Sequence, residues 1–558
     1  MSKGDNLRTG GELLVDTLVA NGVDMAFCVP GESYLAALDA LHGAPSIDLI
    51  TCRQEGGAAI MADAYGKQTG RPGICFVTRG PGATNASAGV HIAYQDSTPM
   101  ILFIGQVGRD MRDREAFQEI DFRRMFGQMA KWVAEIDDAA RVPEYVSRAF
   151  HTAMAGRSGP VVLSLPEDML RDRAPGIEIA AAHRVEAHPG AADMAALRDR
   201  LGAAERPLVI VGGSGWNAKA VANMQDFAAA NHLPVAAAFR FQHLFDNRHD
   251  NYVGDVGIGI NPSLAARVKD ADLLIAVGPR LGEMTTGGYG LLDIPFPSQD
   301  LVHVFSGAEE LGRVYRPGLA INAGMRAFAA AAAAMEPVHG GWSEATAAAR
   351  AAYLDWSTPT EVPGGVNLGR VVEWLRDNLA EGSIICNGAG NFSAWVHRFF
   401  RYTGFGTQLA PTSGSMGYGV PAAIAAKRLH PEKTVVCVAG DGDFMMTAQE
   451  LATAAHHGIP AIFIIANNAT YGTIRMHQER DYPGNVIATD LTNPDFMVYA
   501  QAFGAHGERI EATGDFGAAF ERAQASGKPA IIELITDPEA ITPTATLSGI
   551  RAAAKAGD

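Results

Sequence analysis

Two apolar runs that break into small and polar residues constrain the fold of this chain more than any other feature. The first ends in Gly440-Asp441-Gly442-Asp443 and the second in Asn467-Asn468, with a helical stretch predicted between them over Met445–His457. Such apolar runs are typical of buried parallel strands. The order strand, loop, helix, strand predicts an α/β sheet whose polar strand ends meet at one edge.

Asp441 and Asn468 stand at these two strand ends. Carboxylate and amide oxygens are ligands that Mg²⁺ prefers, and the ion usually completes its shell with water and substrate phosphates. Gly440 and Gly442 let the backbone approach a diphosphate closely. Gly-Asp-Gly is also a common turn, so by itself it is weak evidence for a cofactor site. It indicates one only together with the double Asn at the second strand end.

The same alternation continues along the whole chain. Apolar runs predict strands in three groups, at Met25–Val29, Ile47–Cys52, Ile74–Val77, Met100–Ile104 and Val161–Leu165; at Pro207–Val211, Val235–Phe239, Leu273–Val277 and Leu301–Phe305; and at Ile384–Cys386, Val435–Val438, Ile462–Ala466 and Ala530–Ile535. Strands with helical crossovers at such intervals are typical of doubly wound parallel sheets. We therefore expect an α/β protein with three such domains, at residues 1–175, 190–340 and 365–558, and aperiodic linkers over about 173–190 and 337–365.

Composition limits the class of protein. The 558 residues are 47% hydrophobic and 19% charged, which describes a globular chain with a large core. A formal net charge of −16 argues against nucleic acid or an anionic membrane as a partner. No apolar run approaches the roughly 18 residues of a membrane helix. The five cysteines form no CxxC pair, which favours buried thiols over disulfides or zinc ligands. Their odd number and the polar first residues lead us to expect a cytoplasmic protein.

The Gly-Asp-Gly motif and the double Asn after the next strand resemble the cofactor motif of the thiamine diphosphate (ThDP)-dependent enzymes. Over nearly its full length the chain resembles the acetolactate synthase (acetohydroxyacid synthase) branch of that family. This implies a pyrimidine-binding, a central and a diphosphate-binding domain, in that order, and Mg²⁺ held by Asp441, Asn468 and the carbonyl of Thr470. The family's active site lies between the first domain of one subunit and the third of another, which implies a homodimer or homotetramer. A regulatory subunit stays undecided.

Glu55, in Arg53-Gln54-Glu55-Gly56-Gly57, matches the family glutamate that bonds N1′ of the aminopyrimidine. Proton exchange there drives the ring to an imino form, which removes the thiazolium C2 proton and yields the carbanion catalyst. A surface Glu at the start of a helix is the alternative. Its position after a predicted strand favours the catalytic role.

Other segments resemble the family's cofactor and substrate loops. Met416, between glycines, is similar to the residue that supports the bent cofactor, although a Met is more often core filler. Phe117 and Gln118 match residues that face the substrate, and with Glu55 and Met416 they are the candidate catalytic residues. The remaining candidate cofactor-binding residues are Pro30, Gly31, Thr84, Asn85, Gly390, Asn391, Phe392, Gly414, Gly440, Gly442, Asp443, Tyr471, Gly472 and Ile474.

The chain departs from the family pattern at several positions. Glu167 replaces a lysine near the pocket entrance, His477 replaces the tryptophan that shapes the acceptor pocket, and Asn391-Phe392 replaces a Gln-His pair. The candidate substrate residues are Arg280, Met476 and His477. His477 adds a titratable group to the expected pocket. The acidic pair that follows the central domain's last strand in FAD-binding relatives is missing, while Arg280 matches their arginine, so FAD binding stays open.

The resemblance implies ThDP- and Mg²⁺-dependent decarboxylation of a 2-oxo acid, a small molecule, with carboligation to a carbonyl acceptor. A 2-oxo acid decarboxylase or a C–C lyase on the same scaffold is the alternative. A binding protein without catalysis is disfavoured, because it would not require Glu55 together with Asp441, Asn468 and Met416. The donor, the acceptor and the oligomer size stay open.

Overall fold

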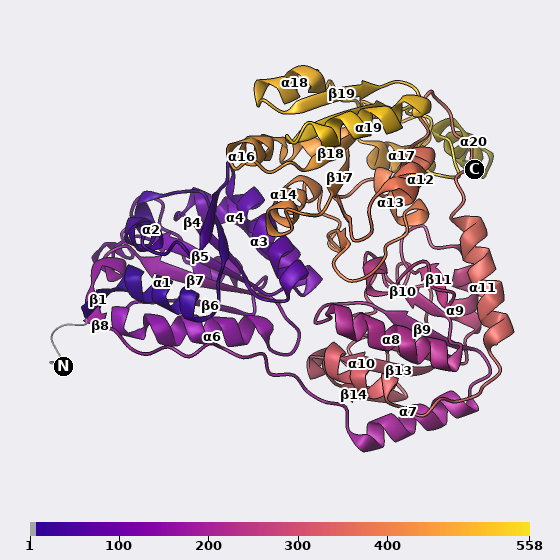
Figure 1. Ribbon diagram of the computed structural model, residues 1–558, viewed down its shortest axis with the longest axis horizontal. Helices are drawn as coiled ribbons and strands as arrows, with labels where there is room; N and C mark the ends of the chain where they lie inside the picture. Colours follow the sequence, from indigo (N-terminus) through magenta and orange to yellow (C-terminus); the bar gives the residue numbers. More distant parts are fainter. Residues whose placement is uncertain (1–6, 558) are drawn as a thin grey trace. The chain divides into compact units, whose positions relative to one another are not determined.

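The structure is a computed structural model that describes residues 7–557 (Figure 1). The chain forms two compact units, one up to Val185 and one from Glu186 onward. The first unit contains one six-stranded parallel sheet and the second contains two. Three parallel sheets confirm the expected fold class.

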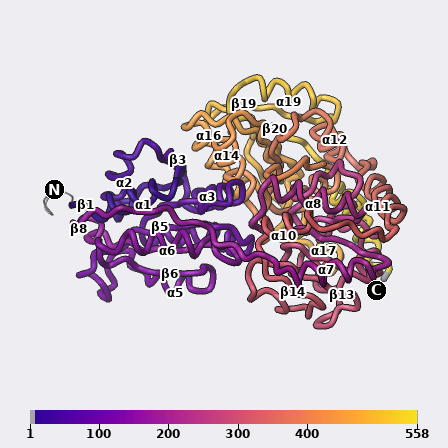
Figure 2. Tube along the Cα trace, turned by 60° about the horizontal axis from the view of Figure 1, so that its bottom comes forward, coloured from indigo at the N-terminus to yellow at the C-terminus, as the bar shows by residue number. Residues whose placement is uncertain are grey.

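The sheet of the first unit has the strand order β3-β2-β4-β5-β7-β6. Helices α1, α2 and α6 cover one face through a large apolar cluster, and α3 and α4 pack together on the other (Figure 1). A short antiparallel pair, β1 with β8, lies beside this sheet (Figure 2). The elements are β1 Leu7–Thr9, α1 Gly10–Ala20, β2 Met25–Cys28, α2 Leu35–His42, β3 Asp48–Thr51, α3 Glu55–Thr69, β4 Gly73–Val77, α4 Pro81–Asp96, β5 Met100–Gln106, α5 Phe122–Phe126, β6 Trp132–Glu135, α6 Val142–Met154, β7 Pro160–Pro166 and β8 Arg173–Pro175.

The first sheet of the second unit has the order β11-β10-β9-β12-β13-β14, with the reversal of winding between β9 and β12. Its strands are nearly all apolar and buried, as parallel strands covered on both faces require. The elements are α7 Ala191–Ala203, β9 Pro207–Val211, α8 Ala218–Asn231, β10 Val235–Ala237, β11 Tyr252–Asp255, α9 Pro262–Asp270, β12 Leu273–Val277, β13 Asp300–Phe305, β14 Leu319–Asn322, α10 Met325–Ala333 and α11 Ser343–Trp356.

The second sheet of this unit has the order β16-β15-β17-β18-β20-β19. If the six strands of each sheet are numbered in chain order, both this sheet and the sheet of the first unit have the spatial order 2-1-3-4-6-5. The two sheets therefore share one topology. The elements are α12 Leu368–Asn378, β15 Ile384–Asn387, α13 Phe392–Phe399, β16 Gln408–Leu409, α14 Gly419–Leu429, β17 Val435–Gly440, α15 Asp441–Met445, α16 Leu451–His456, β18 Ile462–Asn467, α17 Gly472–Asp481, α18 Phe496–Ala502, β19 His506–Ile510, α19 Phe516–Ala525, β20 Ala530–Ile535 and α20 Leu547–Gly557.

Every strand predicted from an apolar run is present, and each sheet falls inside one of the predicted domain ranges. The domain boundaries themselves stay a prediction. Five strands of these sheets were not predicted from the sequence, and all five are edge strands: β6, β11, β14, β16 and β19. Edge strands are short or partly exposed, so their sequences lack the continuous apolar run.

Two local predictions were wrong. The helix expected over Met445–His457 is divided into α15, a short 3₁₀ turn over Ala448–Glu450, and α16. The linker expected over residues 173–190 begins with strand β8, whose partner β1 lies far away in sequence. The prediction for the cysteines is confirmed, because all five thiols are buried and unbridged. Within residues 7–557 no helix is long and apolar enough to cross a membrane.

Candidate functional site

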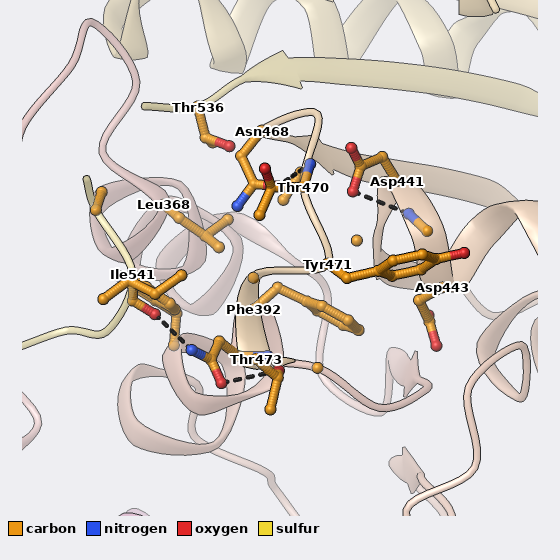
Figure 3. A pocket seen from close by; sticks show the side chains of 18 of the residues that line it. Leu368, Phe392, Asp441, Asp443, Asn468, Thr470, Tyr471, Thr473, Thr536 and Ile541 are labelled. Carbon is orange, nitrogen blue, oxygen red and sulfur yellow. Dashed lines mark hydrogen bonds between the residues drawn. The ribbon is translucent and has the colours of Figure 1, made fainter. Parts of the chain in front are cut away.

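The carboxyl ends of β17 and β18 form the edge at which Asp441 and Asn468 meet. The two strands are adjacent and parallel, with Gly440 opposite Ala466. Asp441 is the first residue of α15, so its carboxylate lies at a helix N-terminus, where negative charge is favoured. Both side chains line a cavity of about 260 Å³ (Figure 3). The predicted convergence of these strand ends is therefore present.

Asp441 is almost fully buried, at 2% exposure. Its Oδ1 accepts a hydrogen bond from the Gly442 N–H at 2.9 Å, and its Oδ2 accepts one from Nδ2 of Asn493 at 2.7 Å. Burial raises the pKa of the carboxyl, and these hydrogen bonds oppose the rise. Asn493 also donates to Oδ1 of Asn467 at 2.9 Å, so it joins both strand ends. Asn493 was not predicted from the sequence, because it lies in a loop before α18 and carries no motif of its own.

Asn468 and Thr470 stand on the turn that follows β18. The N–H of Thr470 donates to Oδ1 of Asn468 at 3.1 Å, and Ala469 between them has φ +52°. One carboxylate, one amide oxygen and one backbone carbonyl in this loop pair are hard oxygen ligands suited to Mg²⁺. Within the described part of the chain no group of three or more His, Cys, Asp or Glu side chains is placed to hold a metal ion.

Asp443 connects two loops of the cavity to α15. Its Oδ1 accepts hydrogen bonds from the N–H groups of Ala389 at 3.0 Å and Gly417 at 2.9 Å. Gly388 must lack a side chain here, since a Cβ would lie 2.1 Å from that oxygen. Burial raises the pKa of Asp443 to about 7. The carboxyl thus positions the loop before Phe392 and the loop that carries Met416.

Asn391 bonds mainly to other protein groups at the wall of this cavity. Its Oδ1 accepts from the Thr473 hydroxyl at 2.9 Å, and its Nδ2 donates to the Ile541 carbonyl at 3.0 Å and contacts Met476 Sδ at 3.4 Å. The side chain therefore ties α17 and the segment after β20 to the start of α13. Phe392, next to it, places an apolar ring against the cavity.

Most of the remaining residues predicted in this region line the cavity, but His477 is not among them. The Nδ1 of His477 is buried without a hydrogen-bond partner among the described residues. Ile474 lines the cavity but is 54% exposed. The other predicted residues that line it are Gly390, Gly414, Met416, Gly440, Gly442, Tyr471 and Gly472.

Glu55 is the first residue of α3, whose N-cap is Gln54. The Asn85 amide donates to its Oε2 at 2.9 Å. Its other oxygen, Oε1, faces Gly82, where a Cβ would lie 3.3 Å away. The first unit therefore brings Glu55 together with the predicted loop after β4. Thr84, on the same loop, is exposed and donates to the carbonyl of Pro81 at 2.9 Å. Pro30 and Gly31 follow β2 at the same edge of this sheet.

Phe117 and Gln118 lie on the connection between β5 and α5. The Phe117 side chain is 72% exposed, and Gln118 has φ +66°. Gln118 packs against Gly80, where a Cβ would lie 2.7 Å from its own Cβ. Glu167 forms an ion pair with Arg79 at 3.2 Å. The charge of Glu167, the residue expected near the pocket entrance, is thus balanced by Arg79.

Arg280 follows β12 in the other sheet of the second unit. Its Nε lies 3.5 Å from Oε1 of Glu310, a buried carboxylate. His303 Nε2 lies 2.9 Å from the Pro279 carbonyl, and burial lowers the pKa of this imidazole. Arg280, which the sequence resemblance suggested as a flavin contact, is therefore paired with a protein carboxylate.

The fold is an α/β protein with three parallel sheets. Two of these sheets share one topology, and each carries a candidate acid, Glu55 or Asp441, at its carboxyl edge. Three family models match the chain: the N-terminal TPP binding domain of thiamine pyrophosphate enzymes over residues 8–125, their central domain over 194–332 and their C-terminal TPP binding domain over 388–534. Thiamine pyrophosphate is another name for ThDP.

Individual relatives show which branch of the thiamine pyrophosphate enzymes the chain resembles. The acetolactate synthase large subunit of Parasynechococcus marenigrum is 33% identical over 90% of this chain and 83% of its own length. The acetolactate synthase isozyme 2 large subunit of Escherichia coli is 29% identical over 95% of each. A probable acetolactate synthase large subunit of Methanocaldococcus jannaschii is 29% identical over 96% of this chain and 93% of its own length. The chain belongs to the thiamine pyrophosphate enzymes, in their acetolactate synthase branch, which confirms the resemblance.

Proposed function

We propose that this protein is a ThDP- and Mg²⁺-dependent enzyme that decarboxylates a 2-oxo acid and joins the remaining fragment to a carbonyl acceptor. The observation that carries the proposal is the cavity at the ends of β17 and β18, where Asp441 and Asn468 lie together. The names of the relatives support the same reaction class.

The residues of the cavity fit a diphosphate bound through a metal ion. Among residues 7–557, no Lys, Arg or His lines it, so an anionic cofactor needs Mg²⁺ and backbone N–H groups to balance its charge. Asp441, Asn468 and the Thr470 carbonyl would hold the ion, and Asn493 would orient the carboxylate of Asp441. When bound, ThDP supplies a nucleophilic carbon and an electron sink for decarboxylation.

Glu55 is the residue we assign to proton exchange with N1′ of the aminopyrimidine. Asn85 occupies its Oε2, so Oε1 is the oxygen we assign to that proton. Met416 lines the cavity on a loop held by Asp443, which supports the assignment that it would contact the cofactor. Phe117 and Gln118 would contact the substrate.

We infer that catalysis proceeds without FAD. The ion pair of Arg280 with Glu310 and the missing acidic pair after β13 support this inference. A stoichiometric flavin spectrum in the purified protein would overturn it.

We also propose a homodimer or homotetramer, in which the first sheet of one subunit serves the diphosphate site of another. Buried, unbridged thiols support a cytoplasmic location. The relatives named as large subunits make a regulatory subunit a partner to test by co-purification.

Reconstitution tests the proposed cofactors. Protein freed of cofactors should release CO₂ from a 2-oxo acid only when ThDP and Mg²⁺ are both added. CO₂ release when ThDP or Mg²⁺ is left out would refute the proposal. So would the absence of CO₂ release from a panel of 2-oxo acids when both are present.

A further inference from the structure

Arg79 connects the loops at the carboxyl edge of the first unit's sheet. It stands two residues after β4 and is 9% exposed. Its Nη1 lies 3.2 Å from Oε2 of Glu167, which follows β7. Its Nε donates to the carbonyl of Phe117 at 3.2 Å. One guanidinium therefore joins the ends of β4 and β7 to the turn that carries Phe117 and Gln118.

The same residue contacts the loop after β2. Its backbone N–H donates to the Ser33 hydroxyl at 3.4 Å, and its Nη2 lies 3.7 Å from Glu32 Oε1. The Ser33 hydroxyl also bonds to that of Thr78 at 2.8 Å. Arg79 is thus fixed at its backbone as well as at its side chain, as a residue that orients other loops should be.

The Phe117–Gln118 turn needs such support. The Phe117 ring is 72% exposed, so side-chain packing within this unit does little to hold it. The turn is held through its backbone, at the Phe117 carbonyl by Arg79 and at the Ile120 carbonyl by Gln106, 2.9 Å away. Gln118 has φ +66° and lies against Gly80, the residue next to Arg79. A shift of Arg79 would therefore move both halves of the turn.

We propose that Arg79 and Glu167 act as a pair of positioning residues for Phe117 and Gln118, and so set how the enzyme holds its 2-oxo acid. The inference rests on the proposed function and extends it. Glu167 balances the Arg79 charge, since its own side chain is only 29% exposed and its carboxylate is paired. Glu167 thus serves to hold an arginine.

Variants of the pair test this role. Arg79→Met should raise KM for the 2-oxo acid by about tenfold or more and change the ratio of products, while the Kd for ThDP stays unchanged, since small displacements of substrate-positioning groups are costly. Arg79→Lys keeps the positive charge but lacks the guanidinium fork, so it should restore only part of the loss. Glu167→Gln should have a smaller effect than Arg79→Met. The double variant should resemble Arg79→Met alone, because residues in one network are not additive.

Arg109 and Asp168 provide a matched control. Asp168 is the residue after Glu167, and Arg109 lies at the start of the β5–α5 connection. The pair is 2.8 Å apart and more exposed than Arg79 with Glu167, with Asp172 and the Asp137 carbonyl as further partners of Arg109. Arg109→Gln should leave KM and the product ratio within about twofold of the wild type, the scale of ordinary surface changes.

Hydrogen exchange of the peptide over residues 113–120 gives a readout that does not need activity. Exchange there should accelerate in Arg79→Met and stay unchanged in Arg109→Gln. Wild-type exchange and wild-type KM in folded Arg79→Met, Arg79→Lys and Glu167→Gln would overturn the pairing role. A wild-type enzyme that releases CO₂ without ligation, or consumes no 2-oxo acid, would overturn the proposed function instead, and the exchange rates would still decide the role of the pair.

Discussion

At the scale of single residues, each of the two candidate acids is held by an asparagine amide. Asn85 donates to Glu55, and Asn493 donates to Asp441. An amide donor orients a carboxylate and favours its charged form without adding a charge of its own. The sequence motif identified both acids and Asn85, but nothing in the chain near Asn493 connects it with Asp441.

Glu55→Gln should keep ThDP bound and lose turnover by about 10²- to 10⁴-fold, the range for removal of a general acid–base group. The glutamine retains the size of the side chain and an oxygen for Asn85, but it cannot exchange the proton. Steady-state CO₂ release and calorimetric titration with ThDP measure the two effects. Full turnover in this variant would show that proton exchange takes place elsewhere.

Asn493→Ala should weaken the apparent affinity for Mg²⁺ by about 10- to 100-fold, as loss of a residue that orients a metal ligand commonly does. The ion binds the deprotonated carboxylate of Asp441, whose pKa is already raised by burial. Loss of the Asn493 bond should raise that pKa further, so the defect should grow as the pH falls.

Titration of ThDP-dependent CO₂ release with Mg²⁺ at two pH values measures this effect. Asn378→Ala is the matched control, because Asn378 is an exposed amide at the end of α12 that donates to the Trp374 carbonyl of its own helix. Equal Mg²⁺ affinity in both variants would contradict the assignment of Asn493.

At the scale of elements, the two sheets of the second unit are joined by buried polar contacts. Gln242, in the segment after β10, donates to the His397 carbonyl at 2.6 Å, and Asn247 Oδ1 accepts from the Tyr402 N–H at 3.0 Å. His397, near the end of α13, packs edge-on against Phe239, and its Nε2 is buried without a hydrogen-bond partner among the described residues. The junction therefore holds an imidazole that must stay neutral.

Acid should weaken this junction. Burial, with repulsion from Arg240, lowers the pKa of His397 well below its usual range. As the pH falls through about 6.5, the unfolded chain takes up a proton at this residue and the folded chain does not, so the free energy of unfolding decreases. His397→Gln removes the titrating group. Between about pH 7.5 and pH 5.5 its free energy of unfolding should therefore fall by about 1 kcal/mol less than that of the wild type.

Urea unfolding at the two pH values measures the difference. His456→Gln, which changes an exposed histidine at the end of α16, should keep the wild-type dependence on pH. If His397→Gln and the wild type lose stability in parallel, the imidazole is not held neutral in the folded protein.

At the scale of the whole molecule, the sequence predicted the three sheets because their central strands are continuous apolar runs. Of the edge strands it predicted β3 but not those such as β19, where charged residues interrupt the run. It placed Asp441 and Asn468 together because both follow neighbouring parallel strands. It could not predict the pairing of Arg79 with Glu167, since these residues are distant in the chain and only the strand order β4-β5-β7 brings them near. Residues that hold a site through long-range side-chain bonds leave no local pattern.

The measurement that most directly tests the central claim is product analysis by NMR with isotopically labelled pyruvate, other 2-oxo acids and aldehyde acceptors, in the presence of ThDP and Mg²⁺. We expect a ligated hydroxy-oxo product, which is acetolactate if pyruvate is both donor and acceptor, and no such product with Glu55→Gln. Free aldehyde as the sole product of every 2-oxo acid would contradict carboligation and identify a decarboxylase on the same fold.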